Sequence, residues 1–322
     1  MSTKNNFYFS EINKEKILSL TSIREGEVKL GQNFTDDYTN ADFVIIGIKE
    51  DIGPQANLGL PGSKNAFDSF LTRFVNMQEN RFLKGETICV LGEIISESNF
   101  KDVQTSRELI EELDELVFSI VAPIIKNGKI PILIGGGHNN AYPLIHAAFS
   151  SKNKGVNIIN LDPHADCRAI EGRHSGNPFS YAKKDNFLNH YTVLGLHQQY
   201  NNESMLQYLD DNGFTFTFYE DYLFNQRNLI QDIQQFITES SKESIGIELD
   251  LDSIAYMPSS AFSPSGFSVE VARNFIHFTA KHKNINYLHL PEGAPLSSKE
   301  EKIVGKTLSY LVSDFVKSKT SN

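Results

Sequence analysis

Cysteine and positive charge are both scarce in this sequence. Two cysteines occur, Cys89 and Cys167, so no disulfide framework is expected. The 30 lysines and arginines are outnumbered by 40 aspartates and glutamates, which gives a net charge of −10. Nucleic acids and anionic membrane surfaces bind basic patches, and none is visible here. We therefore expect a small molecule as the partner, and neither nucleic acid nor membrane.

Long apolar runs are also missing. No stretch approaches the roughly 18 apolar residues of a membrane span, and residues 1–16 are polar without the apolar core of a signal peptide. Together with the few cysteines, this predicts a cytoplasmic protein.

The chain shows no internal repeat, no low-complexity tract and no linker rich in glycine, proline or serine. Its 322 residues would permit two domains, but α/β folds of this size often form one. We expect a single domain over residues 1–322, in which residues 1–40 form a less patterned N-terminal extension.

Short, fully apolar runs are the main structural signal. They span residues 42–48, 87–93, 130–136, 156–161, 191–196, 214–219, 245–251 and 285–290. Such runs are typical of strands buried on both faces of a parallel sheet. The sequence thus predicts a sheet of about eight strands.

The segments between these runs have helical patterns with recognisable ends. Thr105 and Glu108 predict a capping box that opens a helix ending before Gly128, and Ser297 with Glu300 predicts another at the start of the last helix. Alternating strands and helices indicate an α/β fold with a doubly wound parallel sheet.

Asp162, His164 and Asp166 follow one of these strands at alternate positions. In extended backbone their side chains would leave the chain on the same side. Two carboxylates and one imidazole suit Mn(II) or a similar divalent ion. A polar loop after a strand is the alternative for this motif alone.

Other strand ends carry the same kinds of residue. His138 follows three glycines, Asp250 and Asp252 follow another strand, and Glu292 follows the last one. Because open parallel sheets bind ligands at the carboxyl ends of their strands, these side chains are expected at one edge. Two histidines and four aspartates suffice for two metal ions that share bridging carboxylates.

The segments GGGH, DPHAD and DLD (250–252) resemble the three signature segments of the ureohydrolase family, which includes arginase, agmatinase and formimidoylglutamase. The resemblance covers nearly the whole chain. It implies a three-layer α/β/α arginase-like fold, a homotrimer or hexamer, and two Mn(II) ions per subunit. The implied ligands are His138, Asp162, His164, Asp166, Asp250 and Asp252.

The resemblance also implies a reaction. A water molecule activated by two metal ions would attack the carbon of an amidine or guanidine, and an amine would leave. Asp166 would orient this water and carry its proton. Glu292 would pair with the cationic amidine or guanidine, with a solvated loop carboxylate as the alternative.

Departures from the arginase pattern bear on the substrate. Arginases have an aspartate and a serine where this chain has Gly137 and Asn139, and a proton-shuttling histidine where it has Phe179. Agmatinases usually have a histidine at the position where this chain has Ser175. His174 is the neighbouring imidazole and a candidate replacement, or else a structural residue.

The segment HSGNPFSYA and Arg168 most resemble formimidoylglutamase. A guanidinium at Arg168 would hold a substrate carboxylate, and Arg173 is a second candidate, with an exposed loop arginine as its alternative. Ser175 and Asn177 match the family's polar contacts to the same end of the substrate.

The preferred hypothesis is a manganese hydrolase that converts N-formimidoyl-L-glutamate and water to L-glutamate and formamide, in histidine degradation. One alternative is a guanidino-compound hydrolase that releases urea. Another is a family member that has lost catalysis, although six retained ligand positions argue against it. A binuclear metallophosphoesterase would need further histidine segments that the sequence lacks.

Overall fold

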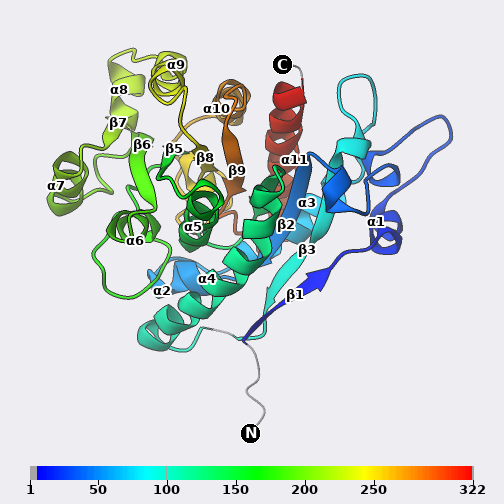
Figure 1. Cartoon of the computed structure of the whole chain (residues 1–322), viewed down its shortest axis with the longest axis horizontal. Helices are drawn as coiled ribbons and strands as arrows, with labels where there is room; N and C mark the ends of the chain where they lie inside the picture. The colour runs from blue at the N-terminus through cyan, green and yellow to red at the C-terminus, as the bar shows by residue number, and fades with distance from the viewer. Residues whose placement is uncertain (1–5, 99, 321–322) are drawn as a thin grey trace, which may run out of the picture.

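The computed structural model describes residues 6–98 and 100–320 of the chain. Within these residues nine strands form one sheet in the order β1-β3-β2-β4-β9-β8-β5-β6-β7 (Figure 1). The strands are β1 (Phe7–Glu11), β2 (Phe43–Lys49), β3 (Ile88–Ser96), β4 (Ile130–Ile134), β5 (Val156–Leu161), β6 (Leu188–Leu196), β7 (Thr215–Phe218), β8 (Ile245–Leu249) and β9 (Ile285–Leu290). Every predicted apolar run forms a strand, and these eight strands pair in parallel. The predicted fold class is confirmed.

The ninth strand, β1, was not predicted and lies in the segment with little pattern. It pairs antiparallel with β3 at the edge of the sheet, from Phe7 opposite Ser96 to Glu11 opposite Gly92. Only Phe7 of this strand is fully buried, which explains why no apolar run marks it. Residues 1–5 of the predicted extension lie outside the described residues.

Helices cover both faces of the sheet and make the three layers. The helices are α1 (Lys14–Leu20), α2 (Ile52–Ala56), α3 (Ala66–Phe74), α4 (Val103–Lys126), α5 (Ala141–Lys152), α6 (Pro178–Lys184), α7 (Glu203–Asp211), α8 (Tyr219–Phe224), α9 (Leu229–Glu239), α10 (Val269–Thr279) and α11 (Ser298–Thr320). Apolar residues of α3, α9, α10 and α11 form one core with one face of the sheet. Those of α4, α5, α6 and α7 form a second core with the other face. Among the described residues, no helix has both the length and the apolar character to cross a membrane.

The middle of the sheet positions the predicted site. The strands β4, β9, β8 and β5 are consecutive neighbours, and they precede His138, Glu292, Asp250 and Asp162 respectively. Because all four run parallel, their carboxyl ends bring these four segments to one edge.

The start of α4 differs from the prediction. The helix begins at Val103, and Asp102 is its N-cap, whose Oδ1 accepts the Thr105 backbone N–H at 2.9 Å. The Thr105 hydroxyl donates to Asp102 Oδ2 at 2.8 Å instead of capping a helix of its own. The capping box predicted for Thr105 and Glu108 is therefore wrong, because an aspartate three residues earlier caps equally well. At α11, half of the predicted capping box forms: the Ser297 hydroxyl accepts the Glu300 N–H at 3.4 Å, but the Glu300 carboxylate accepts the N–H of Leu296, at 2.8 Å, in place of that of Ser297.

We expect Asp102→Ala to lower the free energy of unfolding by about 1 kcal/mol, since it removes the cap of a long helix. Thr105→Ala should have a smaller effect, because its backbone N–H keeps the same acceptor. Urea unfolding followed by circular dichroism would measure both changes. A larger loss in Thr105→Ala than in Asp102→Ala would contradict this assignment of the cap.

Candidate metal centre and active site

His138 reaches the site through a glycine turn. After β4, Gly135 and Gly136 have φ angles of 86° and 66°, a left-handed backbone that glycine adopts without strain. Glu50, which follows β2 and is buried, stabilises this loop: it accepts the N–H of Gly137 at 2.8 Å and that of Gly53 at 2.9 Å. Glu50 was not predicted, although a carboxylate directly after a buried strand was the signal available.

Asp162 and Asp250 each form a tight turn after their strand. Oδ1 of Asp162 accepts the His164 N–H at 2.7 Å, and Oδ1 of Asp250 accepts the Asp252 N–H at 2.7 Å. The extended backbone expected for these motifs is therefore wrong, because an aspartate readily bonds to the backbone two residues on. Asp166 also departs from extended geometry, with a φ of 48°. The turns leave Oδ2 of Asp162 and of Asp250 directed at His138.

Three aspartates converge on one nitrogen of His138. Its Nδ1 lies 3.1 Å from Asp162 Oδ2, 2.9 Å from Asp166 Oδ2 and 3.0 Å from Asp250 Oδ2. Among the described residues, this fully buried nitrogen has no partner that meets hydrogen-bond geometry. One imidazole and three carboxylate oxygens around a common centre are a donor set that fits Mn(II) or a similar divalent ion.

His164 and Asp252 lie on the other side of Asp162. His164 Nδ1 is 3.6 Å from Asp162 Oδ1 and 3.8 Å from Asp252 Oδ2. Asp162 therefore faces His138 with one oxygen and His164 with the other, as a carboxylate that bridges two ions would. The structure thus brings all six predicted ligand residues together, while their role as ligands stays a prediction.

The charges of this cluster oppose one another. Burial, followed by the negative charges of Asp252 and Asp162, raises the pKa of Asp250 well above its usual range. Burial and the charge of Asp162 also raise the pKa of Asp166. Burial alone would lower the pKa of His138, but the surrounding carboxylates of Asp162, Asp166, Asp250 and Glu248 raise it well above its usual range. The cluster therefore favours positive charge at its centre, which protons or divalent cations can supply.

Glu292 lies beside the same cluster. It has a left-handed φ of 68°, and its Oε1 accepts the His138 backbone N–H at 2.6 Å. Burial and the nearby charge of Asp252 raise the pKa of Glu292 to about 8. A bound cation next to this carboxyl group would favour its ionised form.

A cavity of about 290 Å³ opens over the cluster. Its walls combine the metal-type residues with polar and apolar side chains from loops. They are formed by Asn57, Leu58, Gly59, Leu60, His164, Asp166, Arg168, Ser175, Gly176, Tyr200, Met205, Asp250, Asp252, Ser260, Ala261 and Glu292. Arg168 is exposed, and its guanidinium makes no hydrogen bond or ion pair within the described part of the chain. Of the predicted substrate contacts, Arg168 and Ser175 line this cavity.

Arg173 and Asn177 lie behind the cavity wall. Arg173 is only 2% exposed, with its Nε 2.8 Å from Asp114 Oδ2 on α4 and Nη2 2.9 Å from the Asn139 carbonyl oxygen. Asn177 is fully buried and accepts from Arg173 Nη1 at 3.0 Å. The structure therefore corrects their predicted contact with substrate: both hold the loop in place, and Arg173 is neither exposed nor free.

His174 is also outside the cavity. It is fully buried, with Nε2 3.1 Å from Glu171 Oε1, and its Nδ1 accepts the Gly176 N–H at 3.1 Å. Burial and the charge of Arg107 lower the pKa of His174 to about 4. A ring without access to the cavity and with both nitrogens occupied is not placed to transfer a substrate proton, so the prediction of His174 as a catalytic residue is corrected.

The chain belongs to the arginase family, whose model matches residues 41–316. A formimidoylglutamase of Macrococcus caseolyticus is 24% identical over 300 residues, which cover 91% of this chain and 89% of that protein. The Bacillus subtilis formimidoylglutamase structure gives a TM-score of 0.78 at 15% identity, covering 94% and 95% of the two chains. A crystal structure of Trypanosoma cruzi formiminoglutamase with Mn²⁺ gives 0.74 at 21% identity, covering 90% and 98%. The structural matches show a common fold.

The two loop arginines should differ sharply in their effect on stability. Burial raises the pKa of Asp114 to about 6, although Arg173 opposes the shift, so this carboxylate is ionised at pH 8. There we expect Arg173→Met to lower the free energy of unfolding by about 3–5 kcal/mol, because it leaves a buried charge unpaired. Arg168→Met should change it by no more than about 0.5 kcal/mol, as an exposed residue. Denaturant unfolding would test both, and equal losses would contradict the assignment.

Proposed function

We propose that this chain is a binuclear manganese hydrolase that converts N-formimidoyl-L-glutamate and water to L-glutamate and formamide. The observation that carries the proposal is the cluster of two histidines and four aspartates under the cavity, in which Asp162 faces both His138 and His164. Membership of the arginase family and the similarity to formimidoylglutamases support it.

Two Mn(II) ions fit the donor set in two groups. His138, Asp162, Asp166 and Asp250 would hold the first ion. His164 and Asp252 would hold the second, and Asp162, which faces both histidines, would be a ligand of both ions. When bound, the ions would lower the pKa of a water molecule, so that a nucleophile for the substrate carbon is available near neutral pH.

Two side chains of opposite charge in the cavity wall, Glu292 and Arg168, match the two ends of the substrate. Glu292 would pair with the cationic formimidoyl group and hold its carbon over the cluster. The positive charge of this group would favour the ionised form of Glu292, so the contact is charge-assisted. Arg168 would bind a carboxylate of the glutamate portion, and Ser175 lies on the same wall beside Asn57. The cation and the carboxylate therefore fix the orientation of one linear molecule.

Proton transfer is assigned to Asp166. It lines the cavity and contacts His138, so it is positioned to accept the proton of the attacking water and to pass it to the leaving nitrogen. Phe179, at the position of the arginase shuttle histidine, is fully buried, packs its ring edge-on against His138 and carries no titratable group. The carbon–nitrogen bond to glutamate then breaks, and the proton ends on the glutamate amine.

The wider setting follows from the reaction. The proposed reaction would belong to histidine degradation, and we propose a cytoplasmic location, which the free cysteines Cys89 and Cys167 support. The homotrimer or hexamer stays a prediction from the family resemblance, to be measured by light scattering.

We expect protein reconstituted with Mn(II) to release glutamate and formamide from N-formimidoyl-L-glutamate. Asp250→Asn should abolish turnover, because it removes a carboxylate that would hold the first ion. Enzymatic detection of glutamate, with bound manganese quantified in parallel, would measure this. Urea release from a guanidino compound, without glutamate release, would favour the guanidino hydrolase instead. Bound manganese without turnover on either class would support the non-catalytic alternative.

Arg168 should determine the affinity for the acidic substrate. We expect Arg168→Met to raise KM roughly 10- to 100-fold with little change in kcat, because it removes a charge-assisted hydrogen bond of about 1.5–3 kcal/mol. Arg168→Lys keeps the charge but loses the bidentate geometry, so its KM should lie between those of wild type and Arg168→Met. Steady-state kinetics would test the series, and an unchanged KM in Arg168→Met would remove this residue from the substrate site.

A further inference from the structure

A second polar layer lies beneath the ligand cluster, inside the sheet. Glu248 on β8 and His289 on β9 are register partners on neighbouring strands, and Tyr287 precedes His289 by two residues on the same strand. All three side chains are completely buried. None of the three has a part in the proposed reaction.

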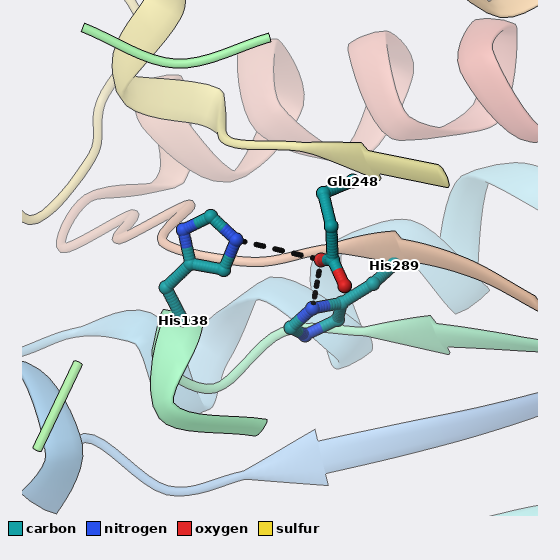
Figure 2. Close-up of side chains that lie close together, drawn as sticks. All are labelled: His138, Glu248 and His289. Atoms are coloured by element: carbon teal, nitrogen blue, oxygen red, sulfur yellow. Dashed lines mark hydrogen bonds and ion pairs between the residues drawn. The ribbon is translucent and has the colours of Figure 1, made fainter. Parts of the chain in front are cut away.

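Glu248 is the centre of this layer (Figure 2). Its Oε2 lies 2.6 Å from His289 Nδ1 and 3.4 Å from Nε2 of His138. Its Oε1 accepts the Tyr287 hydroxyl at 2.7 Å. The carboxylate thus lies between the two imidazole rings, and Tyr287 and His289 fix its orientation.

The strands are shaped to admit this arrangement. Gly246 lies two residues before Glu248 and opposite Tyr287, and a Cβ at Gly246 would overlap the Tyr287 ring. The missing side chain gives the ring room to bring its hydroxyl to the carboxylate. A buried carboxylate, imidazole and phenol cost stability compared with an apolar core, so an arrangement built to hold them calls for a reason beyond packing.

The reason lies in Nε2 of His138, the nitrogen that Glu248 faces. The first proposed ion needs the lone pair of His138 Nδ1, and therefore a ring with its proton on Nε2. Among the described residues Nε2 has no partner that meets hydrogen-bond geometry, and the Glu248 carboxylate 3.4 Å away is the acceptor that it faces, so Glu248 is placed to favour this tautomer. A carboxylate behind a metal-bound histidine fixes both the tautomer and the orientation of the ring. Phe179 packs edge-on against the same ring at 5.4 Å and limits its rotation.

We propose that Glu248 is a positioning residue that holds His138 in the tautomer and orientation required for metal binding, with Tyr287 and His289 as its supports. This inference rests on the proposed metal site. It predicts a change in metal affinity as well as in activity.

The test compares wild-type protein with Glu248→Leu, which removes the acceptor at similar volume, and with Tyr287→Phe, which removes one support and keeps the ring. Mn(II) titration by isothermal calorimetry should show about a 10- to 100-fold weaker first ion in Glu248→Leu, the usual range for loss of such a partner. Tyr287→Phe should bind the first ion several-fold more weakly than wild type. Glu248→Gln keeps an oxygen that can accept from Nε2, so it should retain more of the manganese affinity than Glu248→Leu does.

The outcomes separate this inference from the proposed function. Equal manganese affinity in wild type and a folded Glu248→Leu would overturn the role of Glu248 and leave the metal site standing. If Glu248→Leu does not fold, unchanged affinity in Tyr287→Phe would overturn it. Wild-type protein could also bind a third ion per chain that is absent in Glu248→Leu. That result would assign His138, Glu248 and His289 to a metal site of their own and would overturn the positioning role of Glu248. Wild-type protein that binds no manganese would overturn the metal site and this inference together.

Discussion

Repulsion among four buried aspartates is the constraint on which the rest of this structure depends. Like charges about 4 Å apart repel by about 4 kcal/mol at an effective dielectric constant of 20, so several such pairs strain a domain of ordinary stability. The fold accepts this because four adjacent parallel strands fix the backbone from which the side chains leave. Each charged group is then restrained by the sheet itself, and loops complete only the outer wall of the cavity.

Polar residues support the cluster in successive shells. Glu50 joins the loop after β2 to the glycine turn before His138, and the bonds it accepts from Gly53 and Gly137 leave neither loop free to shift alone. Glu248 extends the polar network one layer deeper into the sheet. The geometry at the centre therefore depends on residues that never face the cavity, and a partly satisfied network of this kind would destabilise the core.

The sequence predicted the central sheet and the convergence of the six ligand-type residues, because buried parallel strands are apolar runs and their ends share an edge. It did not reveal β1, since a short edge strand with one fully buried residue leaves no such run. It also placed Arg173 in the substrate site. Loop arginines look alike in sequence, and only the tertiary position of Asp114, far away on α4, distinguishes a buried anchor from a free guanidinium. Glu248 was hidden for a related reason, because its contacts are on neighbouring strands distant in the chain.

The anchoring of Arg173 bears on how the cavity selects its ligand. Its guanidinium joins α4, the loop around Asn139 and the loop that carries Arg168, and it lies 4.6 Å from the Tyr142 ring centre. A wall held this firmly is ordered before any ligand arrives, so binding costs little conformational entropy. Such a wall also adapts poorly. A ligand whose charged ends have the wrong separation would leave one charge unpaired in the cavity, so discrimination would come from rejecting molecules of the wrong length and not from reshaping the loop around them.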